Sequence, residues 1–284
     1  MMTILYISLA VIVCIALFFL VRMIVRKSIA KQLDLNEGKV LKLVHFGEKD
    51  ACRQLKELMV AKTDAKIVED TINRLPDNRK VPIAKAAVLA ALKAFMADSY
   101  IDDDESEQIN TYCQAGGFST DDLIDFEVWQ QAMRSRVVKK VMDGRIDEVK
   151  VEIQGDLPIL LKKDETVLWL FNKVQFAELR EQTVHYGNAI HVHEKGSYLG
   201  MSSFVSMDQK YKNWENQGKG ILVVTDKNLY FVSPSGNKRI PINQLLSVNP
   251  FIDGIVLQED KSTSKPMSFA NVDGMFIYNI INNL

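Results

Sequence analysis

The chain has 284 residues, of which 47% are hydrophobic and 25% are charged, and its formal net charge is −1. This length suggests about two domains. The composition excludes global disorder, a collagen-like fibre and a disulfide-rich scaffold, and the near-zero charge argues against a protein whose whole surface binds nucleic acid. These averages hide one asymmetry, because the most apolar stretch of the chain lies at its start.

The N-terminal segment predicts a transmembrane helix over residues 3–25. No charged residue occurs from Thr3 to Val21, and about 20 apolar residues in a helix span a hydrocarbon core of roughly 30 Å. A cleaved signal peptide is the alternative, but no basic residue precedes the run and no small-residue cleavage site ends it.

Basic residues follow the apolar run, and we expect them to flank the membrane. They are Arg22, Arg26, Lys27 and Lys31. Because cationic flanks stay on the cytoplasmic side, the pattern predicts a single-pass protein of the cell's inner membrane. Its N-terminus would lie outside, and the bulk of the chain would be cytoplasmic.

Residues 29–145 predict a helical domain, because apolar residues recur there at helical spacing. The clearest helix runs from Pro82 to Ala97 and is expected to bury one apolar face. A second helix is expected to follow an acidic turn and to end at Gly116 and Gly117.

The acidic turn belongs to a stretch from Asp98 to Asp125 that contains nine acidic residues and no Lys or Arg. One explanation is local, with Asp102 or Asp103 capping the second helix. Another is a divalent-cation site, since such cations bind several oxygens, although the spacing of an EF-hand is absent. A third is a docking surface for a basic partner. The candidate metal ligands are Asp98, Asp102, Asp103, Asp104 and Glu105.

The hairpin ALKAFMADSYIDDDESEQINTYCQAGGFS resembles the core of the TerB-like helical domains linked to tellurite resistance. Asp98, Ile101, Asp102 and Glu105 match the family pattern, while Ser99 stands where glycine is usual. The resemblance covers about 40 residues. It implies a membrane-associated stress-response or metal-response system, with metal bound through the acidic residues.

Residues 150–284 predict a β-rich domain closed by a helix. Short strand-like runs alternate with turn signals, which favours a sandwich or barrel. Asp273 is a plausible N-cap for a final helix over Gly274–Asn282. The expected strands are Thr166–Phe171, Ala189–His193, Tyr198–Val205, Gly220–Val224, Leu229–Ser233, Lys238–Ile242 and Gly254–Gln258.

The run from Gly220 to Leu284 resembles bacterial pleckstrin-homology-like (GRAM-related) domains. The residues that carry this resemblance include Gly220, Thr225, Arg239, Gly254 and Asn279. The resemblance implies binding or scaffolding rather than catalysis. The basic pattern with which eukaryotic relatives bind inositol phosphates is absent.

A mildly basic segment of this domain is the candidate surface for anionic lipid headgroups or for a membrane protein partner. Between Lys195 and Pro250 there are seven Lys or Arg against three acidic residues. Each basic residue near an anionic bilayer contributes about 1 kcal/mol. The candidates are Lys210, Lys212, Lys227, Lys238 and Arg239. A solvated, mixed surface is the alternative.

Taken together, the sequence predicts an α+β protein with a single N-terminal transmembrane helix, an all-α domain and a pleckstrin-homology-like barrel or sandwich with a C-terminal helix. We expect a non-enzymatic, membrane-anchored binding or scaffolding protein with no required cofactor, no catalytic residues and no nucleic-acid partner. The alternative is an envelope-stress or metal-responsive module that uses the acidic turn with a divalent cation.

Overall fold

The computed structural model describes residues 2–33, 38–98, 100–149, 151, 153, 159–192 and 201–284. Side chains are described for these residues except 2–11, 14, 32, 98 and 181–211. The chain divides into two compact units, Met1–Lys139 and Lys140–Leu284, and the boundary falls inside a helix. We refer to them as the helical unit and the sheet unit.

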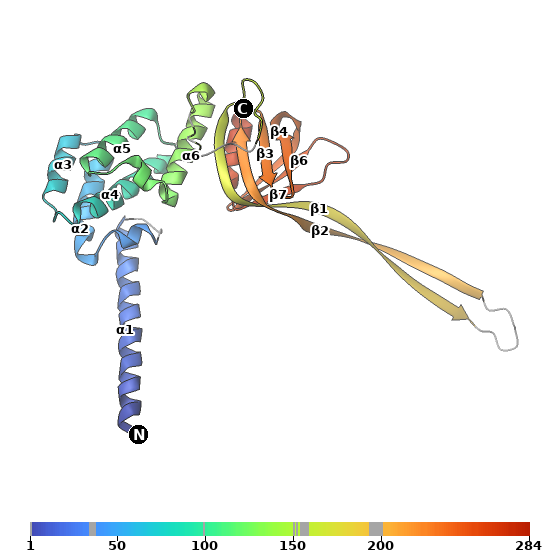
Figure 1. Cartoon of the computed structure of the whole chain (residues 1–284), viewed down its shortest axis with the longest axis horizontal. Helices are drawn as coiled ribbons and strands as arrows, with labels where there is room; N and C mark the ends of the chain where they lie inside the picture. The colour runs from blue at the N-terminus through green and yellow to red at the C-terminus, as the bar shows by residue number, and fades with distance from the viewer. Residues whose placement is uncertain are drawn as a thin grey trace. The chain divides into compact units, whose positions relative to one another are not determined.

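Helices make up the first unit, and a sheet with one closing helix makes up most of the second (Figure 1). The α-helices are α1 (Met2–Leu33), α2 (Lys49–Val60), α3 (Ala65–Asn73), α4 (Lys80–Phe95), α5 (Asp103–Ala115), α6 (Glu127–Met142) and α7 (Gly274–Asn283). The strands are β1 (Val167–Val192), β2 (Met201–Thr225), β3 (Asn228–Ser233), β4 (Gly236–Pro241), β5 (Leu245–Phe251), β6 (Gly254–Glu259) and β7 (Met267–Ala270). Short 3-10 helices are η1 (Val40–Lys42), η2 (Phe46–Glu48), η3 (Met96–Asp98), η4 (Thr120–Leu123), η5 (Ile146–Glu148) and η6 (Ile242–Gln244).

Helix α1 corrects the prediction of a membrane anchor over residues 3–25. Over the part of the chain with described side chains, no helix combines the length and the apolar character that crossing a bilayer requires. Within α1, Arg22 is exposed. Further on, Ile29 and Leu33 are buried in the core of the helical unit.

Three predictions are therefore wrong: the transmembrane helix, the single-pass topology with an outside N-terminus, and the inner-membrane location. The basic residues that were expected to flank the membrane lie on the second half of α1. Arg22, Lys27 and Lys31 are exposed there, and Arg26 is half-buried.

Helix α4 is the centre of the helical unit and contacts α2, α3 and α5. The predicted helix is present, but its burial is wider than the single apolar face expected from the sequence. Its run from Ala86 to Leu92 is buried without interruption. A helix that is apolar on all sides is stable only inside a core, and its alanines allow the neighbouring helices to approach closely.

Arg79, which precedes α4, fastens the start of this helix to the segment before α2. Its guanidinium donates hydrogen bonds to both carboxylate oxygens of Glu48, at 2.6 and 2.7 Å, and to the carbonyl oxygen of Leu43 at 2.8 Å. The Arg79 hydrogen bond holds the pKa of Glu48 below its ordinary value. Bidentate pairs of this kind are the strongest ionic contacts between side chains.

Over its described residues, the sheet unit contains one seven-stranded antiparallel sheet with the strand order β4-β3-β2-β1-β7-β6-β5. Three aromatic rings show that this sheet is curled. The rings of Phe231 on β3 and Phe269 on β7 lie 5.8 Å apart, and Phe176 on β1 contacts both. Because β2 and β1 separate β3 from β7, a flat sheet would hold these strands about 14 Å apart.

Helix α7 covers the curled sheet at the side of β5 and β6. Phe276 packs edge-on against the rings of Trp169 and Phe171 of β1. Asp273 accepts a hydrogen bond from the Phe276 amide at 2.9 Å, so the predicted N-cap and the predicted helix are confirmed. At Gly274 a Cβ atom would collide with carbonyl oxygens of the β5–β6 turn, which is why the helix can approach the turn so closely.

Strand boundaries differ from the prediction in one important respect. The predicted short strands Ala189–His193 and Tyr198–Val205 are parts of β1 and β2, each of which is about 25 residues long, and residues 193–200 lie outside the described residues. The runs predicted at β3, β4 and β6 are strands. Two further strands, β5 and β7, were not predicted.

A half-buried carboxylate, that of Glu165, joins the entry of β1 to the turn between β2 and β3. Glu165 accepts hydrogen bonds from Thr225 Oγ1 at 2.5 Å, Asn228 Nδ2 at 2.8 Å and the Tyr230 hydroxyl at 2.9 Å. Thr225 and Asn228 are almost wholly buried. Burial alone would raise the pKa of Glu165, but these donors outweigh it, and the pKa lies below the ordinary value of 4.5.

We predict that Glu165→Gln destabilises the sheet unit by about 1–3 kcal/mol at neutral pH, because buried donors lose a charged acceptor. The pKa of Glu165 is lowered by folding, so its contribution is present above pH 4.5 and is lost as the pH falls through the lower folded value. Hydrogen exchange of β2 and β3 amides at neutral and acidic pH measures this. The exposed Asp260→Asn is the control, and equal effects of both variants at neutral pH would contradict the prediction.

Candidate functional site

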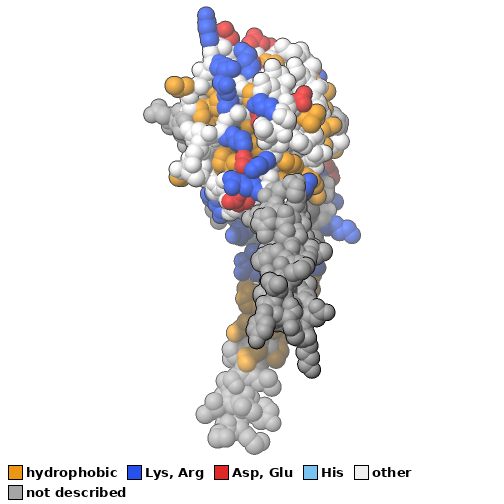
Figure 2. Space-filling model, turned by 90° about the vertical axis from the view of Figure 1, so that its right-hand side faces the viewer, with side chains coloured by type: hydrophobic (Ala, Val, Ile, Leu, Met, Phe, Trp, Pro, Cys, Tyr) orange, Lys and Arg blue, Asp and Glu red, His pale blue; other side chains and the backbone are white. Residues whose placement is uncertain are grey.

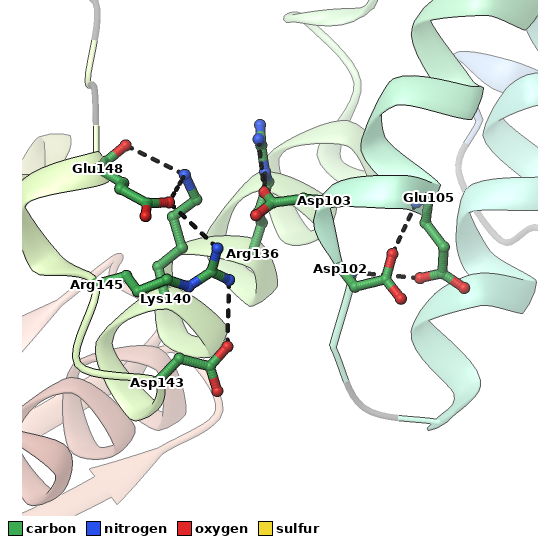
Figure 3. A network of polar contacts seen from close by, with 8 residues as sticks. All are labelled: Asp102, Asp103, Glu105, Arg136, Lys140, Asp143, Arg145 and Glu148. Carbon is green, nitrogen blue, oxygen red and sulfur yellow. Dashed lines mark hydrogen bonds and ion pairs between the residues drawn. The ribbon is translucent and has the colours of Figure 1, made fainter.

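Three side chains of the acidic turn, those of Asp102, Asp103 and Glu105, make hydrogen bonds or ion pairs within the helical unit (Figure 3). Asp102 is the N-cap of α5 and accepts a hydrogen bond from the Glu105 amide at 2.7 Å, and Glu105 in return accepts one from the Asp102 amide at 3.4 Å. This capping box confirms the local explanation of the turn. Glu105 is buried and lies 3.3 Å from Lys62 Nζ, while Asp103 accepts two hydrogen bonds from Arg136.

These contacts direct the neighbouring carboxylates to different elements, Asp103 toward α6 and Glu105 toward the end of α2. Asp104 is exposed, and the side chain of Asp98 lies outside the described ones. Among the described residues, no group of three or more His, Cys, Asp or Glu side chains is placed to hold a metal ion. The divalent-cation site stays a prediction, and nothing described around the turn favours it.

At the start of the sheet unit, a second group of charges holds the end of α6 to η5. Arg145 donates to Asp143 and to Glu148, each at 3.2 Å, and Lys140 donates to the carbonyl and carboxylate oxygens of Glu148 (Figure 3). These pairs join residues close in sequence. They therefore organise the entry to the sheet unit rather than a ligand site.

Both cysteines with described side chains, Cys52 and Cys113, are buried. Burial raises the pKa of Cys52 and that of Cys113 to about 12. Their thiols stay protonated at neutral pH and are poor nucleophiles.

Lys and Arg side chains gather in a band over the sheet unit, with scattered acidic side chains (Figure 2). The predicted basic residues do not form one cluster within it. Lys227 lies in the β2–β3 turn and donates to the carbonyl oxygen of Asp164. Lys238 and Arg239 are neighbours on β4 and therefore lie on opposite faces of the sheet. Lys212 is exposed in the middle of β2, opposite Glu181 of β1, and the side chain of Lys210 lies outside the described ones.

The feature that the structure adds is a two-stranded ribbon. β7 pairs with β1 only over Gln175–Glu178, and β3 pairs with β2 only over Ile221–Val224. Beyond these strands, β1 and β2 continue as 14 consecutive pairs, from Leu179 opposite Trp214 to Val192 opposite Met201. At about 3.3 Å per residue the ribbon is roughly 45 Å long. It extends away from the rest of the sheet (Figure 1).

A β-bulge lies at the base of the ribbon. Phe176 pairs with Gly218 and Ala177 pairs with Asn216, so Gln217 is an extra residue in β2. Gly218 has φ +114°, a backbone conformation that residues other than glycine rarely adopt. Ser235, in the β3–β4 turn, donates to the Gln217 carbonyl oxygen at 2.9 Å. A bulge bends its strand and increases the twist, so this one sets the direction in which the ribbon leaves the sheet.

Ion pairs hold the same base. Glu178 on β1 is directly opposite Glu215 on β2, and like charges in this position repel. Lys238 pairs with Glu178 and lies over the Phe176 ring, while Arg180 lies 2.5 Å from Glu215. Each acidic residue thus has its own cation. Lys238 therefore has a structural role at the ribbon base, where it pairs with Glu178. Its contact with lipid headgroups stays a prediction.

The sequence prediction missed this ribbon. The available signal was the absence of strand breakers, since β1 contains no proline and one glycine, and β2 contains no proline and only Gly218 and Gly220. Among the ribbon residues whose side chains are described, Trp214 stands out. Its side chain is 48% exposed, although tryptophan is typical of buried cores and of interfaces.

Comparisons of the chain with protein-family models, with curated proteins and with solved structures found no match. The resemblances to TerB-like and pleckstrin-homology-like domains therefore stay predictions.

We predict that Asp102→Ala destabilises the helical unit by about 1 kcal/mol, because the Glu105 amide at the start of α5 loses its acceptor. Asp104→Ala is the matched control, since Asp104 is exposed in the first turn of the same helix. Thermal unfolding of both variants measures the difference. A loss of stability no larger for Asp102→Ala than for Asp104→Ala would contradict the capping role.

We also predict that Lys238→Met loosens the ribbon base. Methionine keeps an apolar contact with Phe176 but leaves Glu178 facing Glu215 without its cation, which costs about 1–2 kcal/mol locally. Amide exchange at the ribbon base, from Phe176 to Arg180, is expected to become faster. The control is Arg239→Met, on the opposite face of the same strand, and similar exchange in both variants would refute the clamp.

Proposed function

We propose that the chain is a non-enzymatic binding protein that engages a protein partner through the β1–β2 ribbon. The class comes from the pleckstrin-homology-like resemblance, which implies binding rather than catalysis. The observation that carries the proposal is the ribbon itself. Over its 14 pairs, β1 and β2 have no third strand among the described residues.

Physical chemistry supports a partner at this place. An isolated two-stranded ribbon is marginally stable in water, and unpaired strand edges pair readily with other chains. Strand addition to such an edge is a common way in which proteins recognise extended segments. The bulge and the ion pairs at the base support a ribbon held in one direction, which lowers the entropic cost of binding.

The exposed Trp214 strengthens this proposal. It lies at the first pair of the ribbon, opposite Leu179, and it is large, amphipathic and half exposed. Residues of this type contribute much of the binding free energy at protein interfaces. A partner that lies along the ribbon would cover it.

Site-specific photocrosslinking in cells tests the proposed function. A photoreactive phenylalanine analogue at Gln209, in the middle of the β2 part of the ribbon, is expected to form adducts with protein. The same analogue at the exposed Asn243, in η6, is the control and is expected to form few. If Gln209 yields no more protein adducts than Asn243, the ribbon is not a protein-binding element.

A further inference from the structure

The outer edge of β2 is open along the ribbon. β2 pairs with β3 over Ile221–Val224, and the Gln217 carbonyl accepts from Ser235. From Met201 to Asn216, no strand among the described residues pairs with this edge. The edge therefore offers a long row of backbone donors and acceptors.

We infer that this edge of β2 pairs antiparallel with the same edge of a second copy of the chain, with Gln209 at the two-fold axis. The inference rests on the proposed function and names the partner. The two ribbons then form one four-stranded antiparallel sheet. A two-fold interface uses the same surface on both copies, so a strand that pairs with itself must be self-complementary in sequence.

The charges of β2 meet this requirement in one register. With Gln209 at the axis, Asp208 is opposite Lys210 of the partner subunit, and the symmetry repeats this pair. Met207 is then opposite Tyr211 of the partner subunit, and Phe204 is opposite Trp214 of the partner subunit. Opposite charges and aromatic pairs across strands both stabilise strand pairing.

Other registers of β2 bring like charges together or use less of the edge. An axis at Lys210 places Lys210 opposite itself. An axis midway between Lys210 and Glu215 pairs these two residues, but the overlap then reaches only the base half of the ribbon. With the axis at Gln209, the described strand end at Met201 lies opposite Gln217 at the base. The two β2 strands then pair along the full length of their ribbons, and the pairing ends at the base of each ribbon.

The edge of β1 offers no comparable register. Its only acidic and strongly basic residues in the ribbon are Arg180 and Glu181, which lie at the base. To place Arg180 opposite Glu181 of the partner subunit, the two-fold axis would have to pass between these residues. The paired length of β1 would then extend into the part of the strand that already lies within the sheet. Charge complementarity therefore selects the β2 edge.

Sedimentation velocity of the full chain tests the charge pairs. The native chain is expected to form dimers, and Asp208→Lys or Lys210→Asp is expected to raise the dimer dissociation constant about tenfold or more, because each creates like-charge pairs. The double variant Asp208→Lys with Lys210→Asp is expected to restore dimers. Lys163→Asp, an exposed charge reversal before β1, is the control and should leave the dimer unchanged.

A disulfide crosslink tests the register. In a Cys14→Ser background, in which Cys52 and Cys113 are buried, Gln209→Cys places two thiols at the axis. Under mild oxidation it should crosslink the copies faster than Ser203→Cys, which lies off the axis. A native chain that stays monomeric, a double variant that fails to recover dimers, or faster crosslinking at position 203 would overturn the inference.

The two proposals fail separately. A monomeric chain whose Gln209 photocrosslinks reach a different protein keeps the proposed function and removes the second copy as the partner. A chain without protein adducts at Gln209 and without dimers removes both. Dimers that depend on Asp208 and Lys210 as described support both.

Discussion

The pairing of β1 with β2 past the ends of β3 and β7 is the constraint on which the sheet unit depends. Two strands that leave a sheet together lose the neighbours that would stabilise them, so their base must be held firmly. The Gln217 bulge, the left-handed Gly218 and the Ser235 hydrogen bond hold β2. Lys238 holds β1 through Glu178. Ser235 and Lys238 both belong to the β3–β4 hairpin, so this hairpin holds both strands of the ribbon.

The support of the ribbon in turn depends on the curl of the sheet. Lys238 on β4 reaches Glu178 on β1, although two strands lie between them. The cluster of Phe176, Phe231 and Phe269 draws the same strands inward, and Glu165 fixes the β2–β3 turn from which β3 begins. The core of the sheet and the position of the ribbon are thus linked by the same few contacts.

The helical unit shows how acidic residues that are close in sequence become separated in space. Asp102 caps α5, while Asp103 and Glu105, one and three residues later, pair with different elements. Successive residues in a helix point about 100° apart, so a run of carboxylates at a helix start spreads around the axis. A stretch of charge in a sequence is therefore weak support for a metal site without a second element that brings ligands back.

Local signals were sufficient for much of the fold. The Asp102 and Asp273 caps, the helix at α4 and the strands β3, β4 and β6 depend on neighbours within a few residues, so spacing and capping chemistry predicted them. Strand β7 has only four residues, and β5 carries Pro250 near its end, so neither produced a clear alternating pattern. The membrane anchor was wrong: over the described side chains no helix is long and apolar enough to cross a bilayer, and the last turns of α1 bury Ile29 and Leu33 in the core of the helical unit.

By itself the sequence determined the α+β order of elements, the helix caps and the positions of most turns, since these follow from interactions between residues close along the chain. Only the tertiary structure decided which strands pair, how far β1 and β2 continue, and that Lys238 meets Glu178 across the sheet. The physical reason is that strand register and sheet curvature arise from contacts between residues far apart in the sequence. The candidate binding ribbon is formed by such long-range strand pairing, so it became visible only in the tertiary structure.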